Sequence, residues 1–319
     1  MKIFGILLTF VLLFSCAELT KSDPAPPPYP EGPVLFGDLD SFGSDSTLDI
    51  MTWNVEHFPK SYQNTVEYMA HAIVQLKVDV VSLQEIESTV YFNNLVNQLN
   101  ELDSLNHWVG FRSGSVSSYW GELAYLINDS NIVIVDNPVT IINSDSLYFA
   151  YREPYMIRCG FASQDVYIIN NHFKCCGDGL IDWGNADDEE YRRLIASSLI
   201  RQYIDENLSN EQVIVLGDLN DEIQDAEENN VFMDFISAPE DYLFTDMEIA
   251  QGSSFNWSYP TWPSHIDHIL ITNELFDSFS LTSSTVQTLR LDDYLDGGWG
   301  EYDLYLSDHR PIALKLDLD

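Results

Sequence analysis

Residues 213–220, with the sequence VIVLGDLN, form an apolar run that ends abruptly in a carboxylate and an amide. Four β-branched or leucine residues ahead of Gly217 are typical of a buried strand that is covered on both faces. Asp218 and Asn220 lie two residues apart, so they point to the same side if the extended conformation persists. The run therefore predicts a core strand with polar groups at its end, which form either an ordinary Asp/Asn turn or part of a site.

The alternation of such runs with amphipathic segments from residue 48 onward indicates an α/β domain. Apolar side chains recur with helical period at 61–77, where Ser61 is expected to be the cap, and at 191–199. A short turn at 164–165 predicts a hairpin. Strands are predicted at 48–54, 80–84, 108–111, 123–127, 132–135, 155–161, 166–170, 213–218, 266–272 and 312–316.

Polar groups that suit a hard metal ion and a phosphate stand at the ends of several predicted strands. Sites in open α/β sheets gather outside strand ends. Carboxylate and amide oxygens bind divalent ions, and histidines transfer protons. One polar strand end is ordinary, but the joint pattern favours a hydrolytic metal site. The residues are Asn54, Glu85, His172, Asp218 with Asn220, Asp267, and Asp308 with His309.

The first 46 residues differ in composition from the remainder. An apolar segment at 3–14 has the length of a signal-peptide core and is too short to span a bilayer comfortably. It leads into LFSC, which resembles the lipobox of bacterial lipoproteins and ends at the cysteine that would be lipidated, Cys16. We expect a lipoprotein signal peptide at 1–15, with an ordinary cleaved signal as the alternative. A lipidated Cys16 would begin a disordered, proline-rich tether over 16–46, followed by one domain at 47–319.

The charge balance excludes a diffuse basic surface for gripping nucleic acid. The chain has 51 acidic and 14 basic residues and a net charge of −37, so any phosphate must be met locally by a metal ion or a few cations. Cys159, Cys175 and Cys176 show no zinc-type spacing and imply no full disulfide framework. The adjacent pair either forms a vicinal bridge or remains as two reduced thiols.

The order of motifs resembles that of the endonuclease/exonuclease/phosphatase superfamily, which includes deoxyribonuclease I, abasic-site endonucleases, neutral sphingomyelinases and inositol polyphosphate 5-phosphatases. The resemblance spans about residues 48–318. It implies a four-layer α/β sandwich, in which two mixed β-sheets pack face to face with helices outside. The matching segments are TWN at 52–54, LQE at 83–85, NNH at 170–172, GDLN at 217–220, HIDHIL at 265–270 and SDHRP at 307–311.

The resemblance also implies catalytic roles. Asp218 would orient and deprotonate the attacking water, while Asn220 would hold a phosphate oxygen or the nucleophile. His309, fixed by Asp267, and His172 would contact the scissile phosphate and favour the charge that accumulates in the transition state.

Metal and supporting roles follow in the same way. Glu85 would bind Mg²⁺, assisted by Asn54 and Asp308, with Mn²⁺ as a substitute and Ca²⁺ as a structural ion. Glu122 stands where the deoxyribonuclease I branch has a glutamate that supports its first histidine. Arg152, in the segment REP, resembles a phosphate-facing arginine of that branch.

The resemblance implies a Mg²⁺-dependent phosphodiesterase, and specifically a deoxyribonuclease I-like nuclease on a bacterial outer membrane or cell surface. DNA is favoured over RNA as its substrate, and the protein is expected to be a monomer that meets the membrane only through Cys16. A sphingomyelinase-like enzyme, a phosphatase of small phosphate esters and a non-catalytic binding lipoprotein are the alternatives. A calcineurin-like metallophosphoesterase is disfavoured because no early D-x-H and no G-N-H-[DE] motif occurs.

Overall fold

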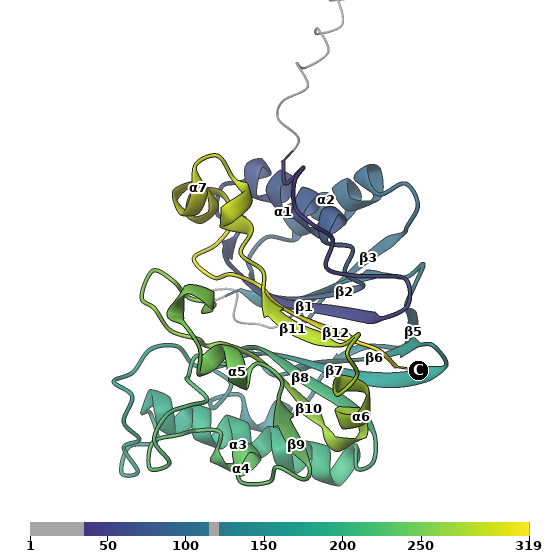
Figure 1. Ribbon diagram of the computed structural model, residues 1–319. Helices are drawn as coiled ribbons and strands as arrows, with labels where there is room; N and C mark the ends of the chain where they lie inside the picture. Colours follow the sequence, from purple (N-terminus) through teal and green to yellow (C-terminus); the bar gives the residue numbers. More distant parts are fainter. Residues whose placement is uncertain (1–34, 115–120, 319) are drawn as a thin grey trace, which may run out of the picture. The chain divides into compact units, whose positions relative to one another are not determined.

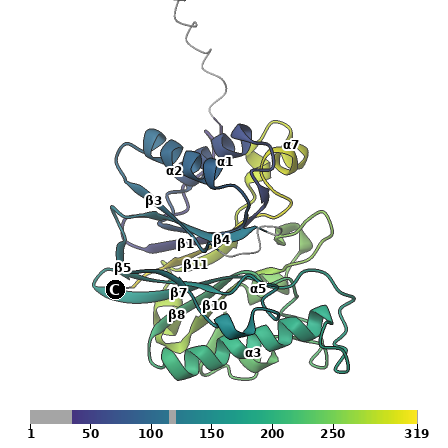
Figure 2. The same cartoon turned by 180° about the vertical axis from the view of Figure 1, so that it is seen from behind.

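Two six-stranded β-sheets form the centre of the folded body, with helices on their outer faces (Figures 1 and 2). The computed structural model describes residues 35–114 and 121–318. One sheet has the order β11 (Thr285–Thr288), β12 (Ile312–Leu316), β1 (Leu48–Phe58), β2 (Val80–Ile86), β4 (Glu122–Asn128) and β3 (Trp108–Arg112). The other has the order β5 (Val133–Thr140), β6 (Tyr155–Phe161), β7 (Gln164–His172), β8 (Gln212–Asp218), β10 (Asp267–Thr272) and β9 (Tyr242–Phe244).

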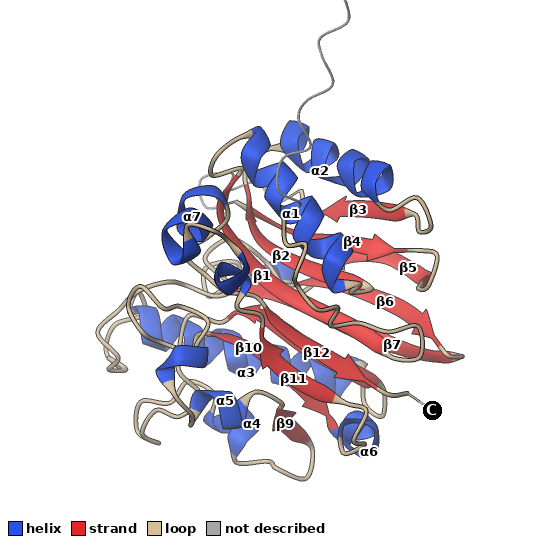
Figure 3. Cartoon of the chain, turned by 45° about the horizontal axis from the view of Figure 1, so that its top comes forward, coloured by secondary structure: helices blue, strands red, loops and turns tan. Residues whose placement is uncertain are grey.

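The helices divide between the two outer faces, as the secondary-structure colouring of Figure 3 also shows. On the first sheet lie α1 (Gln63–Leu76), α2 (Thr89–Leu102) and α7 (Gly298–Tyr305). On the second side lie α3 (Glu189–Asn207) and the short helices α4 (Met233–Ile236), α5 (Met247–Ala250) and α6 (Phe276–Phe279). Both sheets combine parallel and antiparallel pairs, so the four-layer sandwich with two mixed sheets is confirmed.

The strands alternate their side chains between two apolar layers, as a period of two residues requires. In β8, Ile214 and Leu216 enter the core between the sheets, which also contains Ile50 of β1. Val213 and Val215 point the other way, into the layer under α3. Covering on both faces explains why residues 213–216 are uniformly apolar.

The predicted tether is too long at its C-terminal end. Phe36, Leu39 and Phe42 are buried against the helical layer of the first sheet, and the amide of Phe42 donates to the carbonyl of Leu76 at 3.0 Å. Burial of three large apolar side chains holds residues 35–46 on the body. The predicted signal peptide, Cys16 and the first part of the tether lie outside the described residues.

Two local predictions differ from the structure, and one helix is not predicted. The α1 cap residue is Tyr62, without a side-chain cap bond, and the predicted cap Ser61 lies outside the helix. The β6–β7 turn lies at Ala162 and Ser163, both with positive φ, whereas Gln164 is already paired in β7. The sequence also does not predict α2, because its many asparagines are weak helix formers.

Strand direction brings the predicted site residues to one edge of the sandwich. β1 runs parallel to β2, and β7 runs parallel to β8, so Asn54, Glu85, His172 and Asp218 stand at equivalent ends. β10 is antiparallel to β8, and its first residue, Asp267, pairs with Asp218. β12 is likewise antiparallel to β1, so the residues before β12 reach the same edge.

A buried acid pair at the start of β1 predicts a pH-dependent stability. Burial, reinforced by the charge of Asp79, raises the pKa of Asp49 from 3.8 to about 7. Because the folded state then binds the proton more tightly than the unfolded state, stability falls as pH rises from about 4 to about 7. Asp49→Asn cannot ionise, so we expect the wild type to lose stability relative to this variant over that interval, by a few kcal/mol at most.

Urea unfolding of the two proteins at a series of pH values measures this difference. The variant also loses a hydrogen-bond acceptor for the amide of Ser44, but that loss gives a constant offset. A difference in unfolding free energy that stays constant from about pH 4 to about pH 7, or that changes so that the wild type gains stability relative to Asp49→Asn, would contradict the raised pKa of Asp49.

Candidate active site

A cleft of about 370 Å³ opens at the edge where these strand ends meet. Its lining contains seven of the residues predicted for the site, together with others that the sequence does not single out for a role. The predicted ones are Asn54, Glu85, His172, Asp218, Asn220, Asp308 and His309. The additional ones are Glu56, His57, Cys175, Cys176, Tyr259, Ser264 and Ile266.

Local backbone geometry turns Glu85 and Asp218 towards the cleft. Glu85 has a φ of 64° at a register shift in the β2–β4 pairing, and a Cβ on the facing Gly121 would lie 2.4 Å from its backbone. A Cβ on Gly217 would lie 2.0 Å from the carbonyl oxygen of Asn171. Glycine at these two positions lets the strands approach each other closely beside the site.

His309 lies between two carboxylates at the centre of the cleft. Its Nδ1 is 2.7 Å from Oδ2 of Asp267, and its Nε2 is 3.9 Å from Oδ2 of Asp218. Burial alone would lower the pKa of His309, but Asp267 and Asp218 outweigh it and raise the pKa to about 10. The imidazole is therefore charged at neutral pH, and its Nε2–H faces Asp218.

His309 is held by four groups, three of which contact its main chain and one its ring. The indole of Trp53 and the hydroxyl of Tyr302 both donate to the His309 carbonyl, at 3.2 and 2.6 Å. The hydroxyl of Ser307 accepts from the His309 amide at 2.9 Å. The ring of Tyr259 lies against the imidazole with 4.8 Å between centroids. These contacts give His309 a fixed orientation before any substrate is present.

Asp218 is buried among groups that disfavour its ionised form. Burial raises its pKa to about 7, and the charges of Asp267 and Glu85 act in the same direction against His309. The amide nitrogen of Asn54 donates to Oδ2 of Asp218 at 2.8 Å and to Oε1 of Glu85 at 3.1 Å. Asp218 therefore has a proton affinity in the range that suits a base working near neutral pH.

His172 differs from His309 in its charge. Burial, together with the nearby charges of Arg152 and His309, holds the pKa of His172 well below its usual range, so the ring is neutral. Its Nε2 lies 3.4 Å from Oδ2 of Asp218. Its Nδ1 is buried without a hydrogen-bond partner among the described residues.

Arg152 lies behind the cleft rather than in its lining. Its guanidinium donates to the carbonyls of His172 and Phe173 at 3.3 and 2.9 Å. Burial lowers its pKa, and the carboxylates of Glu85 and Asp218 oppose that effect. Arg152 therefore positions the end of β7 that carries His172. Its positive charge acts on Glu85 and Asp218 in the cleft.

Glu122 forms no hydrogen bond or ion pair with His172 among the described residues. Its carboxylate forms an ion pair with Arg112 at 2.8 Å and accepts from the amide of Gly114 at 3.3 Å. The support that the resemblance implies for the first histidine is thus absent from the described contacts of Glu122. Arg112 on the neighbouring β3 competes for this carboxylate.

Asn220 reaches the cleft by a turn and not by continued extension. Its φ is 55°, because β8 ends at Asp218. Its amide N–H donates to Oδ1 of Asp218 at 3.1 Å, and its side-chain nitrogen donates to the carbonyl of Phe173 at 3.3 Å. Asn220 and Asp218 consequently form one rigid corner of the cleft.

The donor set of the cleft suits a hard divalent cation. Carboxylates of Glu56, Glu85 and Asp308 line the same space, and oxygen ligands of this kind hold partly hydrated Mg²⁺. Burial and the charge of Asp308 raise the pKa of Glu56, so a cation would relieve repulsion there. The side-chain oxygen of Asn54 accepts from the amide of Glu56 at 3.0 Å, which leaves its second lone pair for a cation or a cation-bound water.

Glu56 is a carboxylate of the cleft that the motifs do not identify. It lies two positions after Asn54 in β1, accepts from the amide of Asp308 at 3.0 Å and contacts Lys60. The same period of two that makes Trp53 and Val55 apolar places Asn54 and Glu56 towards the other face. That alternation is a usable signal for Glu56.

His265 and His268, which flank Asp267, face away from His309. Both contact Oδ2 of the buried Asp246, at 3.0 and 2.6 Å. His268 also lies 2.9 Å from the carbonyl of Asp221. Both histidines are therefore bound to the chain that follows β9, and His268 also connects β10 to the chain that follows β8.

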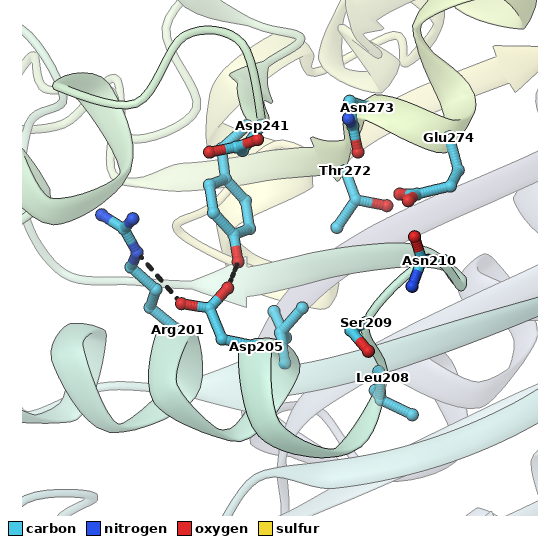
Figure 4. Close-up of a pocket in the computed structure, with 11 residues that line it drawn as sticks. Arg201, Asp205, Leu208, Ser209, Asn210, Asp241, Thr272, Asn273 and Glu274 are labelled. Carbon is cyan, nitrogen blue, oxygen red and sulfur yellow. Dashed lines mark hydrogen bonds and ion pairs between the residues drawn. The ribbon is translucent and has the colours of Figure 1, made fainter.

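A second hollow, of about 290 Å³, lies between α3 and the ends of β9 and β10 (Figure 4). Asp205 accepts from the hydroxyl of Tyr242 at 2.6 Å and pairs with Arg201 at 3.5 Å (Figure 4). None of the predicted site residues lines it. Arg201 and Asp205 pair with each other there, and the predicted residues gather at the strand ends instead, so the cleft at the strand ends is the candidate site.

The chain belongs to the Endonuclease/Exonuclease/phosphatase family, whose model matches residues 51–309. Members of this family are metal-dependent hydrolases of phosphate esters, and that class is confirmed for this chain. No curated protein sequence matches the chain. Among the described residues, none of the helices combines the length and apolar character needed to cross a bilayer.

Solved structures with the same fold are distant in sequence. D. rerio TDP2 in complex with single-strand DNA product superposes with a TM-score of 0.59 at 17% identity, covering 85% of this chain and 99% of that one. The human Nocturnin catalytic domain with bound sulfate gives 0.56 at 15% identity, with 85% and 94% covered. An endonuclease/exonuclease/phosphatase from Bacteroides vulgatus gives 0.56 at 14% identity, with 86% and 99% covered.

Proposed function

We propose that this protein is a Mg²⁺-dependent phosphodiesterase that cleaves DNA. The observation that carries the proposal is the group formed by Asp218, Asp267 and His309, in which a base with a pKa of about 7 lies 3.9 Å from a charged imidazole. A base beside a fixed cation is what the attack of water on a phosphate diester requires.

In this mechanism Asp218 accepts the proton of the attacking water, which the corner with Asn220 helps to hold. The Nε2–H of His309 and the neutral ring of His172, which both lie near Asp218, would contact the phosphate. The positive charge of Arg152, which lies behind the cleft, favours the additional negative charge of the transition state. A bound Mg²⁺, held by Glu85 with Glu56 and Asp308, would supply Lewis-acid stabilisation of that charge.

DNA is proposed as the substrate for two reasons. The TDP2 structure with the same fold contains a single-strand DNA product, and a net charge of −37 leaves the metal-binding cleft as the place where a polyanion can be met. RNA, sphingomyelin and inositol phosphates are the competing substrates. Incubation of the purified full chain with each, in Mg²⁺ and in EDTA, distinguishes them, and hydrolysis of a competitor without DNA cleavage would overturn this assignment.

Cys16 leads us to propose an exported lipoprotein that displays the enzyme on the surface of a bacterium. The support is the LFSC segment after an apolar core of signal-peptide length. Lipidation would anchor the enzyme without a membrane-spanning segment. Fractionation of cells that express the wild type or Cys16→Ser tests this: recovery of both proteins in the same soluble fraction would exclude the anchor.

Glu85 predicts a direct effect on metal binding. Glu85→Gln removes one charge and one strong oxygen ligand, so we expect Mg²⁺ affinity, measured by calorimetry, to fall about tenfold or more. Glu87→Gln is the control, because Glu87 contacts the side chain of His57 at 2.6 Å but is not among the residues that line the cleft. Equal Mg²⁺ affinity for Glu85→Gln and Glu87→Gln would remove Glu85 from the metal site.

A further inference from the structure

Two adjacent thiols form part of the wall of the catalytic cleft. Cys175 and Cys176 both line it, and their sulfur atoms lie 3.0 Å apart. Cys176 is exposed and Cys175 is half-buried. Both thiols are therefore within reach of a small molecule that enters the cleft, and neither takes part in the mechanism above.

The main chain on either side of the thiol pair is held in place by one buried arginine. The guanidinium of Arg193 donates to the carbonyl of Lys174 at 2.8 Å and to the carbonyl of Cys176 at 2.7 Å. It is itself fixed by Asp221 at 2.7 Å. Clamping of both flanking peptides leaves the Cys175–Cys176 peptide and the two side chains as the parts that can rearrange.

The surroundings of the two thiols differ in a way that assigns their roles. The ammonium of Lys174 lies 3.8 Å from Sγ of Cys175, so a positive charge stands beside this sulfur. The S–H of Cys176 donates to the same sulfur, and this bond and burial raise the pKa of Cys176 to about 11. Cys175 is thus the attacking sulfur, and Cys176 is the thiol that completes the reaction.

We propose that Cys175 and Cys176 are an oxidisable dithiol site that small-molecule disulfides convert to a vicinal disulfide in the wall of the catalytic cleft. The Cys175 thiolate attacks a disulfide such as oxidised glutathione, breaks its S–S bond and releases one glutathione thiolate. Cys176 then loses its proton and attacks the sulfur of Cys175, which displaces the second glutathione thiolate. The protein thiols are oxidised, and one glutathione disulfide is reduced to two glutathione molecules.

Closure of this bond changes the cleft because the flanking carbonyls are held by Arg193. Drawing together sulfur atoms that start 3.0 Å apart shifts the two side chains and the peptide between them, in the cleft that His172 and Asp218 also line. We expect the oxidised protein to hydrolyse its phosphodiester substrate about tenfold more slowly, since small displacements near reacting groups have effects of this size. This part of the inference rests on the proposed function.

Tryptic digestion of the full chain places the two adjacent cysteines and the control residue, Cys159, in different peptides. Cleavage after Lys174 and Arg192 releases both adjacent thiols in one peptide, 175–192, and the preceding peptide, 159–174, contains only Cys159. Cys159 is fully buried in β6. After native protein is treated with oxidised glutathione and then alkylated under denaturing conditions, we expect peptide 175–192 to lose two hydrogen atoms and to escape alkylation. Peptide 159–174 should be alkylated normally, and dithiothreitol should reverse the change.

Single variants test the assigned roles. Cys176→Ser should retain a glutathione adduct on Cys175, because no thiol is left to displace it, whereas Cys175→Ser should react slowly. A wild-type peptide that stays reduced, or that retains glutathione on both sulfurs, would overturn the site.

The effect on turnover is tested separately. Rates of phosphodiester hydrolysis with and without oxidant are compared within the wild type and within the double serine variant. An oxidised wild type that cleaves at the reduced rate would overturn the effect on turnover, and the mass measurement decides the site even if no phosphate ester is hydrolysed.

Discussion

Replacement of Asp218 by asparagine is expected to lower kcat for DNA cleavage by roughly 10³-fold, which is typical for loss of a general base. The amide has the shape of the carboxylate, and its oxygen can keep one of the hydrogen bonds from Asn54 and Asn220, but its nitrogen cannot accept the other and the group does not take a proton from water. Because burial raises the pKa of Asp218 to about 7, its ionised form is costly in the fold. We therefore expect the melting temperature of Asp218→Asn in EDTA to equal or exceed that of the wild type.

Asp205→Asn is the matched control for this substitution. Asp205 is also a hydrogen-bonded aspartate, but it lies in the second hollow, away from the cleft (Figure 4). The Asp205→Asn variant should cleave DNA at the wild-type rate. If Asp218→Asn unfolds at a clearly lower temperature, its lost activity would indicate structural damage rather than loss of a base.

Replacement of His309 by alanine is the second large effect, and we expect roughly 10²- to 10³-fold slower turnover. His309 is charged at neutral pH because Asp267 and Asp218 raise its pKa to about 10 against the effect of burial. Its loss removes the fixed cation that would face the phosphate. Steady-state kinetics should show the loss mainly in kcat, because the cation matters most for charge that develops in the transition state.

His107 provides a comparison with the same pair geometry in another setting. Its Nδ1 lies 2.7 Å from Asp129, as His309 lies 2.7 Å from Asp267, but the side chain of His107 is 65% exposed. His107→Ala should leave kcat unchanged. A similar kcat loss for both alanine variants, or none for His309→Ala, would contradict the role of His309.

The strand that ends in Asp218 shows what the sequence can predict. Because β8 is covered on both faces, residues 213–216 are all apolar, and this pattern predicts a buried strand. The carboxylate at the end of the strand predicts a site residue. The shape of the turn after it was not predictable in the same way. Asn220 adopts a φ of 55°, and only the facing carbonyl of Phe173 shows why its side chain turns inward.

Competition between partners explains why Glu122 differs from its expected role. A glutamate beside a histidine strand is a reasonable expectation from motif order alone. In the fold, however, the antiparallel pairing of β3 with β4 brings Arg112 within 2.8 Å of Glu122. Charge pairing across strands depends on register, which local sequence specifies weakly.

The sequence does not predict that Cys175 and Cys176 line the cleft, for a different reason. Cys175 and Cys176 follow the histidine strand in a loop, where no hydrophobic period reports which side chains face a cleft. Their position follows from Arg193, which is far along the chain in α3 and binds the carbonyls of Lys174 and Cys176. Long-range anchors of this kind are not visible in a local pattern.

The most direct measurement of the central claim is metal-restored cleavage of a defined DNA strand. The full chain and Asp218→Asn, purified in parallel and stripped with EDTA, are incubated with end-labelled DNA before and after addition of excess Mg²⁺, and products are resolved on a denaturing gel. The account predicts that Mg²⁺ restores cleavage to the wild type and that the Asp218→Asn sample stays inactive. Cleavage by the wild type in EDTA, equal cleavage by Asp218→Asn, or no hydrolysis of DNA or any other phosphodiester with Mg²⁺ or Mn²⁺ would contradict it.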